Sequence, residues 1–131
     1  MDVRTVKCFL FLITYSILFA ASTLACPLKC NCHVPRVVSC HGQNLTSIPE
    51  NIPPETQKLE LHENKITVIK KEDLANLRQL KILQLTDNEI ASIEDSAFDA
   101  LESLEKLKLN RNKLRNLPAD LLKNCRRLHR L

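Results

Sequence analysis

The sequence predicts an α/β solenoid with one curved parallel β-sheet, and three observations lead to that prediction. A Leu-x-Leu triplet, followed by an asparagine and two further apolar residues, occurs three times between residues 58 and 117. The asparagines Asn64, Asn88 and Asn112 keep a period of 24 residues. A group of four cysteines stands just before the repeats, at positions 26, 30, 32 and 40.

Each Leu-x-Leu triplet places two apolar side chains on one face of a short strand, where both can point into a core. A fixed period of this length and the pattern L-x-x-L-x-L-x-x-N-x-L are typical of a leucine-rich repeat. One repeat cannot bury its own apolar face, so neighbouring repeats must stack. We therefore expect the strands to line a concave parallel sheet, with short irregular or helical segments on the outside. An array of amphipathic helices would not supply these triplets.

The three repeat asparagines are predicted to form a hydrogen-bonded ladder. The chain turns out of the strand after each triplet, and the turning backbone has donors and acceptors that need partners. An asparagine amide has both donor and acceptor groups. Asn64, Asn88 and Asn112 are therefore expected to bond neighbouring turns to one another.

The cysteines before the repeats are predicted to form two disulfides, because closely spaced cysteines in an exported chain usually pair. The residues themselves leave all three pairings open. A zinc site completed by nearby histidines is the alternative. The uncovered end of a solenoid needs a cap, however, so we expect a disulfide-bonded N-terminal cap, no metal and no cofactor. The cap cysteines are Cys26, Cys30, Cys32 and Cys40.

Residues 1–25 are predicted to be a secretory signal peptide. Arg4 and Lys7 precede an apolar run over residues 8–21, and Thr23 and Ala25 suit cleavage before Cys26. The run is shorter than the roughly 20 apolar residues that cross a bilayer, and no later stretch in the chain could cross one. We expect a secreted, extracellular protein. Its predicted parts are the signal peptide 1–25, a cap with a first partial repeat 26–57, repeats 58–127, and the start of a truncated further repeat 128–131.

The first partial repeat has Val38-Ser39-Cys40 in the place of the triplet and Gln43 in the place of the ladder asparagine. Asn44-Leu45-Thr46 is an N-glycosylation sequon. Asn44 falls between two positions that are expected to point inward, Gln43 and Leu45. We therefore expect Asn44 to point outward and to carry a glycan.

Polar side chains between the inward leucines are predicted to form a protein-binding surface on the concave face. A rigid curved sheet that presents polar groups is typical of binding solenoids. The change from acidic to basic residues along the repeats would orient a partner. The alternative is that these are simply solvated strand positions. The candidate binding residues are Lys58, Glu60, His62, Gln84, Thr86, Asp87, Lys106, Lys108, Asn110 and Arg111.

Charge and aromatic content limit the other classes of function. From residue 106 to the end there are nine Lys or Arg and one acid, Asp120. This surplus would favour a sulfated glycan such as heparan sulfate, and an unevenly charged solvated surface is the alternative. Nucleic acid is not expected, because the chain is predicted to be secreted and only Phe98 is aromatic after residue 25. His62 stands between two glutamates, but no nucleophile accompanies it, so no enzyme is expected.

The end of the sequence predicts an uncapped solenoid. Cys125 takes the position of Leu77 and Leu101, which predicts a buried thiol. The sequence stops inside the next strand, so we expect Leu107 and the three leucines that follow it to be exposed and the chain to be the first part of a longer protein.

Five segments carry a resemblance to one family: Val38–Gly42, Ile48–Pro53, Leu83–Leu85, Ile93–Phe98 and Leu109–Asn112. The narrower signals among them, beyond the repeat consensus, are Cys40–Gly42, Ile48–Pro53 and Leu109–Asn112. The five segments resemble the first leucine-rich repeat domain of the Slit guidance ligands, and the resemblance runs from about residue 26 to the end.

The Slit resemblance implies a secreted ligand for a Roundabout-type receptor in axon guidance and cell migration, with heparan sulfate as a second partner. In that family the receptor contact belongs mainly to the second repeat domain, which lies outside this chain. The cap resembles that of extracellular leucine-rich repeat proteins, which implies the pairs Cys26–Cys32 and Cys30–Cys40. The alternative is the N-terminal ectodomain of a leucine-rich repeat receptor, adhesion or matrix protein.

Overall fold

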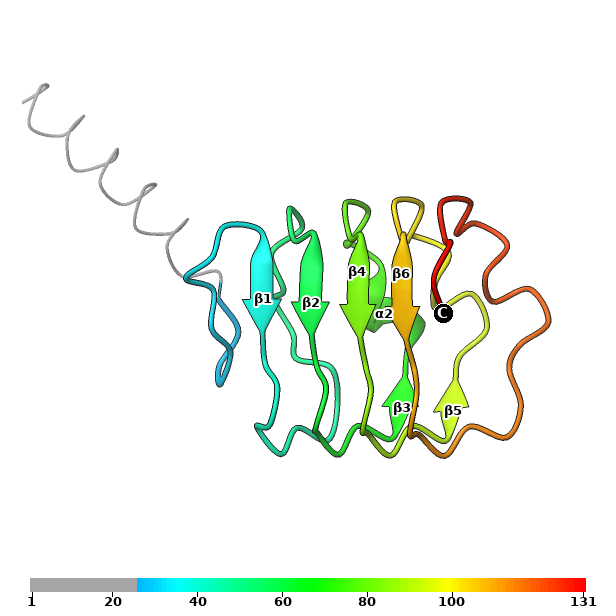
Figure 1. The fold of residues 1–131 in the computed structure, drawn as a ribbon, viewed down its shortest axis with the longest axis horizontal. Coiled ribbons are helices and arrows are strands. Elements are labelled where there is room, and N and C mark those ends of the chain that lie inside the picture. Colours follow the sequence, from blue (N-terminus) through cyan, green and yellow to red (C-terminus); the bar gives the residue numbers. More distant parts are fainter. Residues whose placement is uncertain (1–25) are drawn as a thin grey trace, which may run out of the picture.

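The computed structural model describes residues 26–131 (Figure 1). The predicted signal peptide, residues 1–25, lies outside the described residues. Four strands form a parallel sheet in the order β1-β2-β4-β6, and two shorter strands form a second sheet, β3-β5. The elements are β1 (Val37–Ser39), β2 (Lys58–Glu60), β3 (Val68–Ile69), α2 (Lys71–Leu74), β4 (Ile82–Gln84), β5 (Ser92–Ile93) and β6 (Lys106–Lys108).

Consecutive turns of the solenoid stack in register. Leu59 of β2 pairs with Leu83 of β4, and Leu83 pairs with Leu107 of β6. In each of the four strands one buried residue stands between two half-buried residues. This alternation is that of a sheet with one face on the core, and it confirms the predicted leucine-rich repeat solenoid.

The outer side of the solenoid contains a short helix and a second sheet. Among the described residues α2 is the only helix, and none there has the length and apolar character needed to cross a bilayer. Lys70 donates its backbone N–H to Asp73 Oδ2 at 2.8 Å, which closes the first turn of α2. The sequence did not predict β3 and β5. They form because the β-branched Ile69 and Ile93 share one position in the repeat and pair directly.

A single apolar core runs through the stacked turns. Leu59, Leu61, Leu83 and Leu85 are fully buried beneath the concave sheet, and Phe98 fills the space behind it. Burying a side chain of this size contributes about 1.5–3 kcal/mol. The core therefore depends on neighbouring repeats, since each leucine is covered by the turns on either side.

The last turn covers more of the core than the sequence predicted. Leu107 was expected to be exposed, but only 1% of it is exposed. Its backbone N–H donates to the carbonyl of Arg130 at 3.0 Å, and Leu121 and Cys125 are buried in the same turn. Leu117 is 54% exposed, as expected. The prediction was wrong for Leu107 because residues 118–131 already supply most of one covering turn.

Candidate binding surface on the concave sheet

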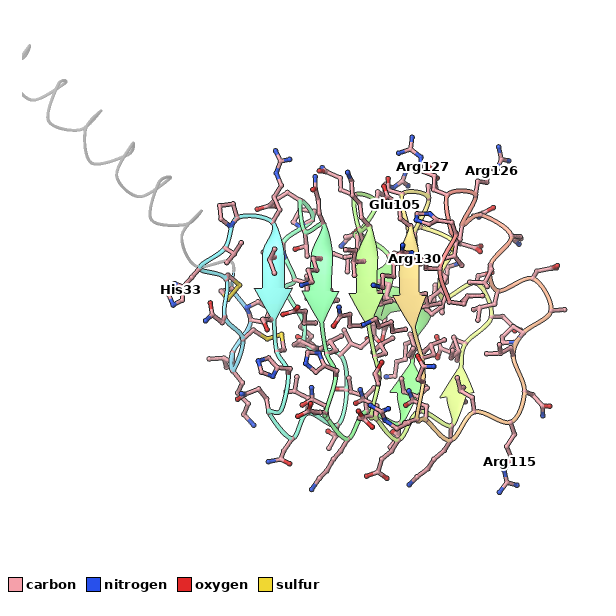
Figure 2. The ribbon with its side chains drawn as sticks, in the orientation of Figure 1. His33, Glu105, Arg115, Arg126, Arg127 and Arg130 are labelled. Carbon is pink, nitrogen blue, oxygen red and sulfur yellow. A yellow bond between two sulfur atoms is a disulfide. The ribbon has the colours of Figure 1, made fainter. Side chains whose placement is uncertain are left out.

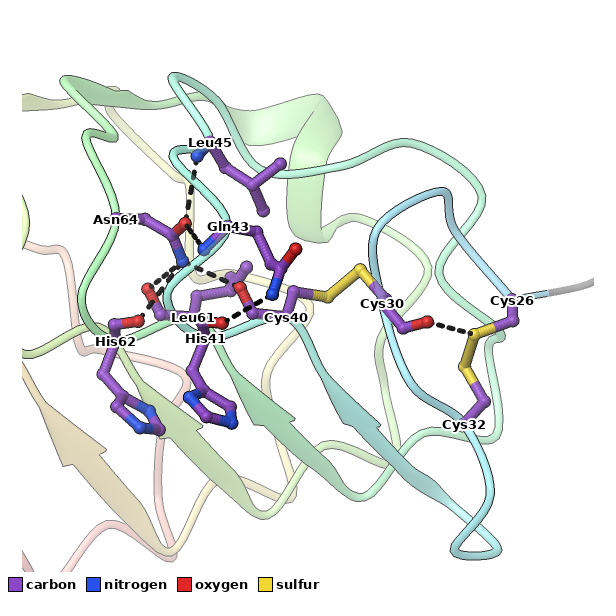
Figure 3. The surroundings of a disulfide bond; sticks show 10 residues. All are labelled: Cys26, Cys30, Cys32, Cys40, His41, Gln43, Leu45, Leu61, His62 and Asn64. Carbon is purple, nitrogen blue, oxygen red and sulfur yellow. Dashed lines mark hydrogen bonds between the residues drawn. A yellow bond between two sulfur atoms is a disulfide. The ribbon is translucent and has the colours of Figure 1, made fainter.

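An asparagine ladder fixes the turn that follows each strand of the four-stranded sheet, and Figure 3 shows its first member, Asn64. Asn64 Nδ2 donates to the carbonyls of Cys40, at 2.9 Å, and Leu61, at 3.0 Å. Asn64 Oδ1 accepts the backbone N–H groups of Gln43 and Leu45, both at 3.0 Å. One buried amide therefore satisfies backbone groups of two successive turns, which would otherwise be unpaired.

The same bonds recur one repeat later and again in the third. Asn88 Nδ2 donates to the carbonyl of Leu61 at 2.8 Å, and its Oδ1 accepts the N–H of Ile66 at 3.1 Å. Asn112 Nδ2 donates to Leu85 at 2.9 Å. Each amide therefore reaches back to the preceding repeat.

Gln43 does not take the ladder role in the first turn. Its position predicted an inward side chain, but the residue is exposed and its Nε2 donates to the carbonyl of His41 at 3.2 Å. The inward prediction for Gln43 was wrong because Asn64 reaches back from the next repeat and supplies the amide instead.

Two disulfides hold the cap that covers the first strand. The structure joins Cys26 to Cys32 and Cys30 to Cys40 (Figure 3). Asn31 and Ser39 exchange backbone hydrogen bonds of 2.7 and 2.9 Å in an antiparallel bridge. The cap therefore pairs the outer edge of β1, which would otherwise be an open strand edge.

The candidate binding residues lie in rows across the concave face. The register aligns Lys58 with Ile82 and Lys106, and it aligns Glu60 with Gln84 and Lys108. The next row holds His62, Thr86 and Asn110, and the turn beyond it holds Asp87 and Arg111, each with a left-handed φ. The strand positions in these rows are half-buried, so their polar atoms stand at the surface while their stems pack together.

Ion pairs neutralise the acidic residues of this face. Lys58 Nζ lies 2.6 Å from Glu60 Oε1, and this bond lowers the pKa of the Glu60 carboxyl. The Arg111 guanidinium binds both carboxylate oxygens of Asp87, with Nη2 2.6 Å from Oδ2. That bidentate pair lowers the pKa of Asp87 and raises the pKa of Arg111. Both candidate acids of this face are therefore in ion pairs, while Lys106 and Lys108 have no acid within salt-bridge distance in residues 26–131.

Two imidazole rings stack on the concave face next to the cap. The rings of His41 and His62 are 4.9 Å apart between centroids and 7° from parallel. The sequence reasoning did not find this pair. Each histidine directly follows the second inward residue of its triplet, Cys40 or Leu61, so the register could have predicted that the two are neighbours, although not that their rings stack. His62 Nδ1 and Thr86 Oγ1 are buried and lack a hydrogen-bond partner within residues 26–131.

The remaining candidate residues lie away from this face. Asn44 is exposed and has a left-handed φ of 54°. Cys125 is 6% exposed, as its position predicted, and burial raises the pKa of its thiol. No group of three or more His, Cys, Asp or Glu side chains within residues 26–131 is arranged to hold a metal ion.

Comparison with known proteins agrees with this architecture. Residues 25–53 match the "Leucine rich repeat N-terminal domain" model, and residues 78–131 match the "Leucine rich repeat" model. The chain is similar to pig (Sus scrofa) biglycan, 37% identical over 106 residues, which are 79% of this chain and 38% of biglycan. It is 36% identical over 99 residues to mouse (Mus musculus) podocan, covering 74% of this chain and 16% of podocan. Human (Homo sapiens) reticulon-4 receptor-like 2 is 35% identical over 109 residues, which are 82% of this chain and 26% of that protein.

Solved structures show the same fold. The mouse RP105/MD-1 complex matches with a TM-score of 0.69 and 26% identity, over 74% of this chain and 16% of that chain. Human 5T4 matches with a TM-score of 0.66 and 32% identity, over 71% of this chain and 35% of that chain. The chain spans well under half the length of the curated relatives it matches.

These comparisons correct one prediction and support others. The Slit resemblance was wrong, because the relatives are biglycan, podocan and receptor-like proteins. The chain is a leucine-rich repeat solenoid with a disulfide-bonded N-terminal cap. Its relatives are leucine-rich repeat proteins such as biglycan and a receptor-like protein, in agreement with the prediction that this chain is not an enzyme.

Proposed function

We propose that this chain is a secreted extracellular module that binds a partner protein on its concave sheet. It belongs with the extracellular leucine-rich repeat modules of proteoglycans and receptors, which the sequence suggested only as the alternative to a Slit-like ligand. One observation carries the proposal. Half-buried polar side chains from four parallel strands form a continuous face that no described segment covers, and the asparagine ladder fixes their backbone.

The physical argument is pre-organisation. A binding face on a rigid scaffold loses little conformational entropy when a partner docks. Lys58 and Gln84 lie on strands that are paired on both sides, and Lys108 lies on β6, which pairs with β4 and is bridged to Arg130 on its other side, so their positions are set before binding. The face also combines apolar and polar surface, since Ile82 is half-buried among these side chains. That mixture is typical of protein interfaces.

Secretion is supported by the cap and the sequon. Two disulfides in a small cap are typical of proteins that fold outside the cytosol. The exposed Asn44 stands in an asparagine-leucine-threonine sequence that the export pathway can glycosylate. We propose that Asn44 carries a glycan on the edge of the solenoid, outside the concave face.

A glycan placed on the concave face tests the binding proposal. Gln84→Asn creates an asparagine-leucine-threonine sequence, because Leu85 and Thr86 follow it. Arg78→Thr creates the same tripeptide at Asn76, an exposed residue just after α2 on the outer side, and serves as the matched control. The wild-type protein and both variants would be secreted by mammalian cells and screened against an array of purified extracellular domains.

We expect one or more extracellular domains to bind the wild-type protein and the Arg78→Thr variant but not the Gln84→Asn variant. Thermal melting of all three proteins checks that the added glycan leaves the fold intact. Binding that survives a glycan at position 84 and disappears with a glycan at position 76 would move the site to the outer side and contradict the proposal.

A further inference from the structure

A cluster of three cations occupies the C-terminal end of the concave face. We call Lys106, Lys108 and Arg130 the basic cluster. Lys106 and Lys108 are the two half-buried residues of β6, so they project on the same side of the sheet. Arg130 lies beside Lys106 in a parallel bridge, and Figure 2 shows it next to β6. The three side chains therefore start from neighbouring positions on β6 and on the segment bridged to it.

None of the cluster's cations has a counter-ion within residues 26–131. Elsewhere the structure pairs cations with acids: Lys58 with Glu60, Arg111 with Asp87, and, off the concave face, Lys113 with Glu89 at 2.7 Å. The only acid in the facing part of β4 and its turn is Asp87, and Arg111 already binds both of its oxygens. Like charges at neighbouring positions of β6 and of the segment bridged to it repel, because salt screens charges this close together only in part. An anionic ligand would relieve that repulsion.

The geometry of β6 indicates what kind of anion fits. Lys106 and Lys108 are two residues apart on a strand, so their stems are about 7 Å apart. Alternate side chains of an extended peptide have the same spacing. A segment with acidic residues at alternate positions therefore matches both lysines at once. Ile82 and Gln84, the neighbours of these lysines on β4, offer an apolar contact and a hydrogen-bonding amide to the backbone of the same segment.

The distribution of the other free cations argues against a long sulfated glycan. Arg126 and Arg127 stand at the edge where the strands begin, while Arg115 stands at the opposite edge (Figure 2). Three further cations of the C-terminal surplus are engaged by acids of the preceding repeat: Arg111, Lys113 and Lys123. A linear polyanion that follows the strand-start edge from Arg126 and Arg127 would therefore leave Arg115 at the opposite edge uncontacted.

We propose that the basic cluster binds an extended acidic segment of the partner protein, with carboxylates at alternate positions on Lys106 and Lys108. This inference rests on the proposed function, because it assigns the chemistry of the partner that the concave face binds. It replaces heparan sulfate, which the sequence suggested from the same surplus of charge.

A defined peptide tests the chemistry without knowledge of the natural partner. The probe is a fluorescein-labelled peptide of alternating threonine and glutamate, and its control has glutamine in place of glutamate. Fluorescence anisotropy would be measured with the full secreted protein in about 0.15 M salt, where distant charges are screened. A heparin oligosaccharide is titrated in parallel.

Two double variants with the same loss of charge give the contrast. Lys106→Gln with Lys108→Gln removes the proposed contacts, while Arg126→Gln with Arg127→Gln removes two exposed cations from the strand-start edge. We expect the first pair to weaken glutamate-peptide binding about tenfold, since two exposed ion pairs are lost. The second pair should leave binding within about twofold of the wild-type protein, and the glutamine peptide should bind neither double variant nor the wild-type protein.

The inference would be overturned by equal losses in the two double variants, by equal binding of the two peptides, or by binding of heparin alone. It fails separately from the proposed function. Binding of an extracellular domain could be abolished by Gln84→Asn but unchanged by Lys106→Gln with Lys108→Gln. In that case the concave face binds a partner of other chemistry. If binding of that domain is also unchanged by Gln84→Asn, the proposal that the partner binds the concave face is wrong.

Discussion

The side-chain amide of Asn64 donates a hydrogen bond of 2.9 Å to the carbonyl of Cys40, the residue that a disulfide joins to Cys30 in the cap. One bond therefore links the cap to the first full repeat. Asn88 and Asn112 repeat the link from turn to turn. The cap, the ladder and the sheet form one connected structure, and their stabilities should depend on one another.

Removing a ladder amide should destabilise the protein in proportion to its burial. Asn64→Ala leaves the carbonyl of Cys40 without its buried donor and the backbone N–H groups of Gln43 and Leu45 without their acceptor, while the Leu61 carbonyl keeps its bond from Asn88. Each group left unpaired costs about 1–3 kcal/mol. We expect a loss of about 2–4 kcal/mol in the free energy of unfolding, measured by urea denaturation. Asn116→Ala, at an exposed position, should change it by less than about 0.5 kcal/mol. Equal effects at both positions would refute the ladder as a source of stability.

The two cap disulfides should contribute unequally. The Cys30–Cys40 bond closes a separation of 10 residues and fixes a fully buried residue, while Cys26–Cys32 closes a separation of 6 and begins at an exposed residue. Replacing Cys30 and Cys40 by alanine should lower stability by about 2–4 kcal/mol, and the other pair should cost less. Denaturation of both double variants measures the difference, and a larger loss for Cys26 with Cys32 would be the contrary result.

A glycan at Asn44 should appear in secreted material. Residues 43 and 45 donate their backbone N–H groups to Asn64 Oδ1, which leaves the side chain between them free at the surface. Asn44→Gln and Thr46→Ala should each abolish the mobility shift that peptide-N-glycosidase produces. Thr46→Ser keeps the sequon and should keep the shift. An unshifted wild-type protein, with the expected peptide mass by mass spectrometry, would reject glycosylation.

Stability should fall in acid because folding lowers the pKa of Glu60. The bond from Lys58 holds that pKa below its ordinary value of 4.5, so the unfolded chain binds the proton more readily. The contribution is therefore fully present above about pH 5 and is lost as the pH falls through the lower folded pKa. Unfolding measured from pH 7 to pH 3 should show a smaller decline for Glu60→Gln than for Glu55→Gln, which alters an exposed residue. Identical declines would show that the ion pair of Lys58 with Glu60 does not cause the loss of stability in acid.

The repeat period predicted most of the fold because consecutive turns can bury their leucines together in only one register. Leu59, Leu83 and Leu107 must fall in register if every turn is to bury its leucines, and that register also fixes the asparagine positions. The sheet β3-β5 was missed, since its two-residue strands carry no alternation long enough to recognise. Gln43 and Leu107 were misjudged because their surroundings are supplied from elsewhere, by Asn64 and by the last turn.

The sequence located the concave face but not its electrostatics. Counting charges predicted a change from acidic to basic along the repeats. Whether a charge is free depends on cross-strand neighbours, and pairs such as Asp87 with Arg111 lie 24 residues apart. The stack of His41 on His62 depends on side-chain rotation as well as register.

Site-specific photo-crosslinking tests the central claim most directly. A photoreactive amino acid would replace Thr86, on the concave face, or Asn76, on the outer side, and each protein would be irradiated with the extracellular domain found in the binding screen. Binding on the concave sheet predicts a covalent adduct from position 86 and none from position 76. An adduct from position 76 alone would show that the partner docks on the outer side and would contradict the account.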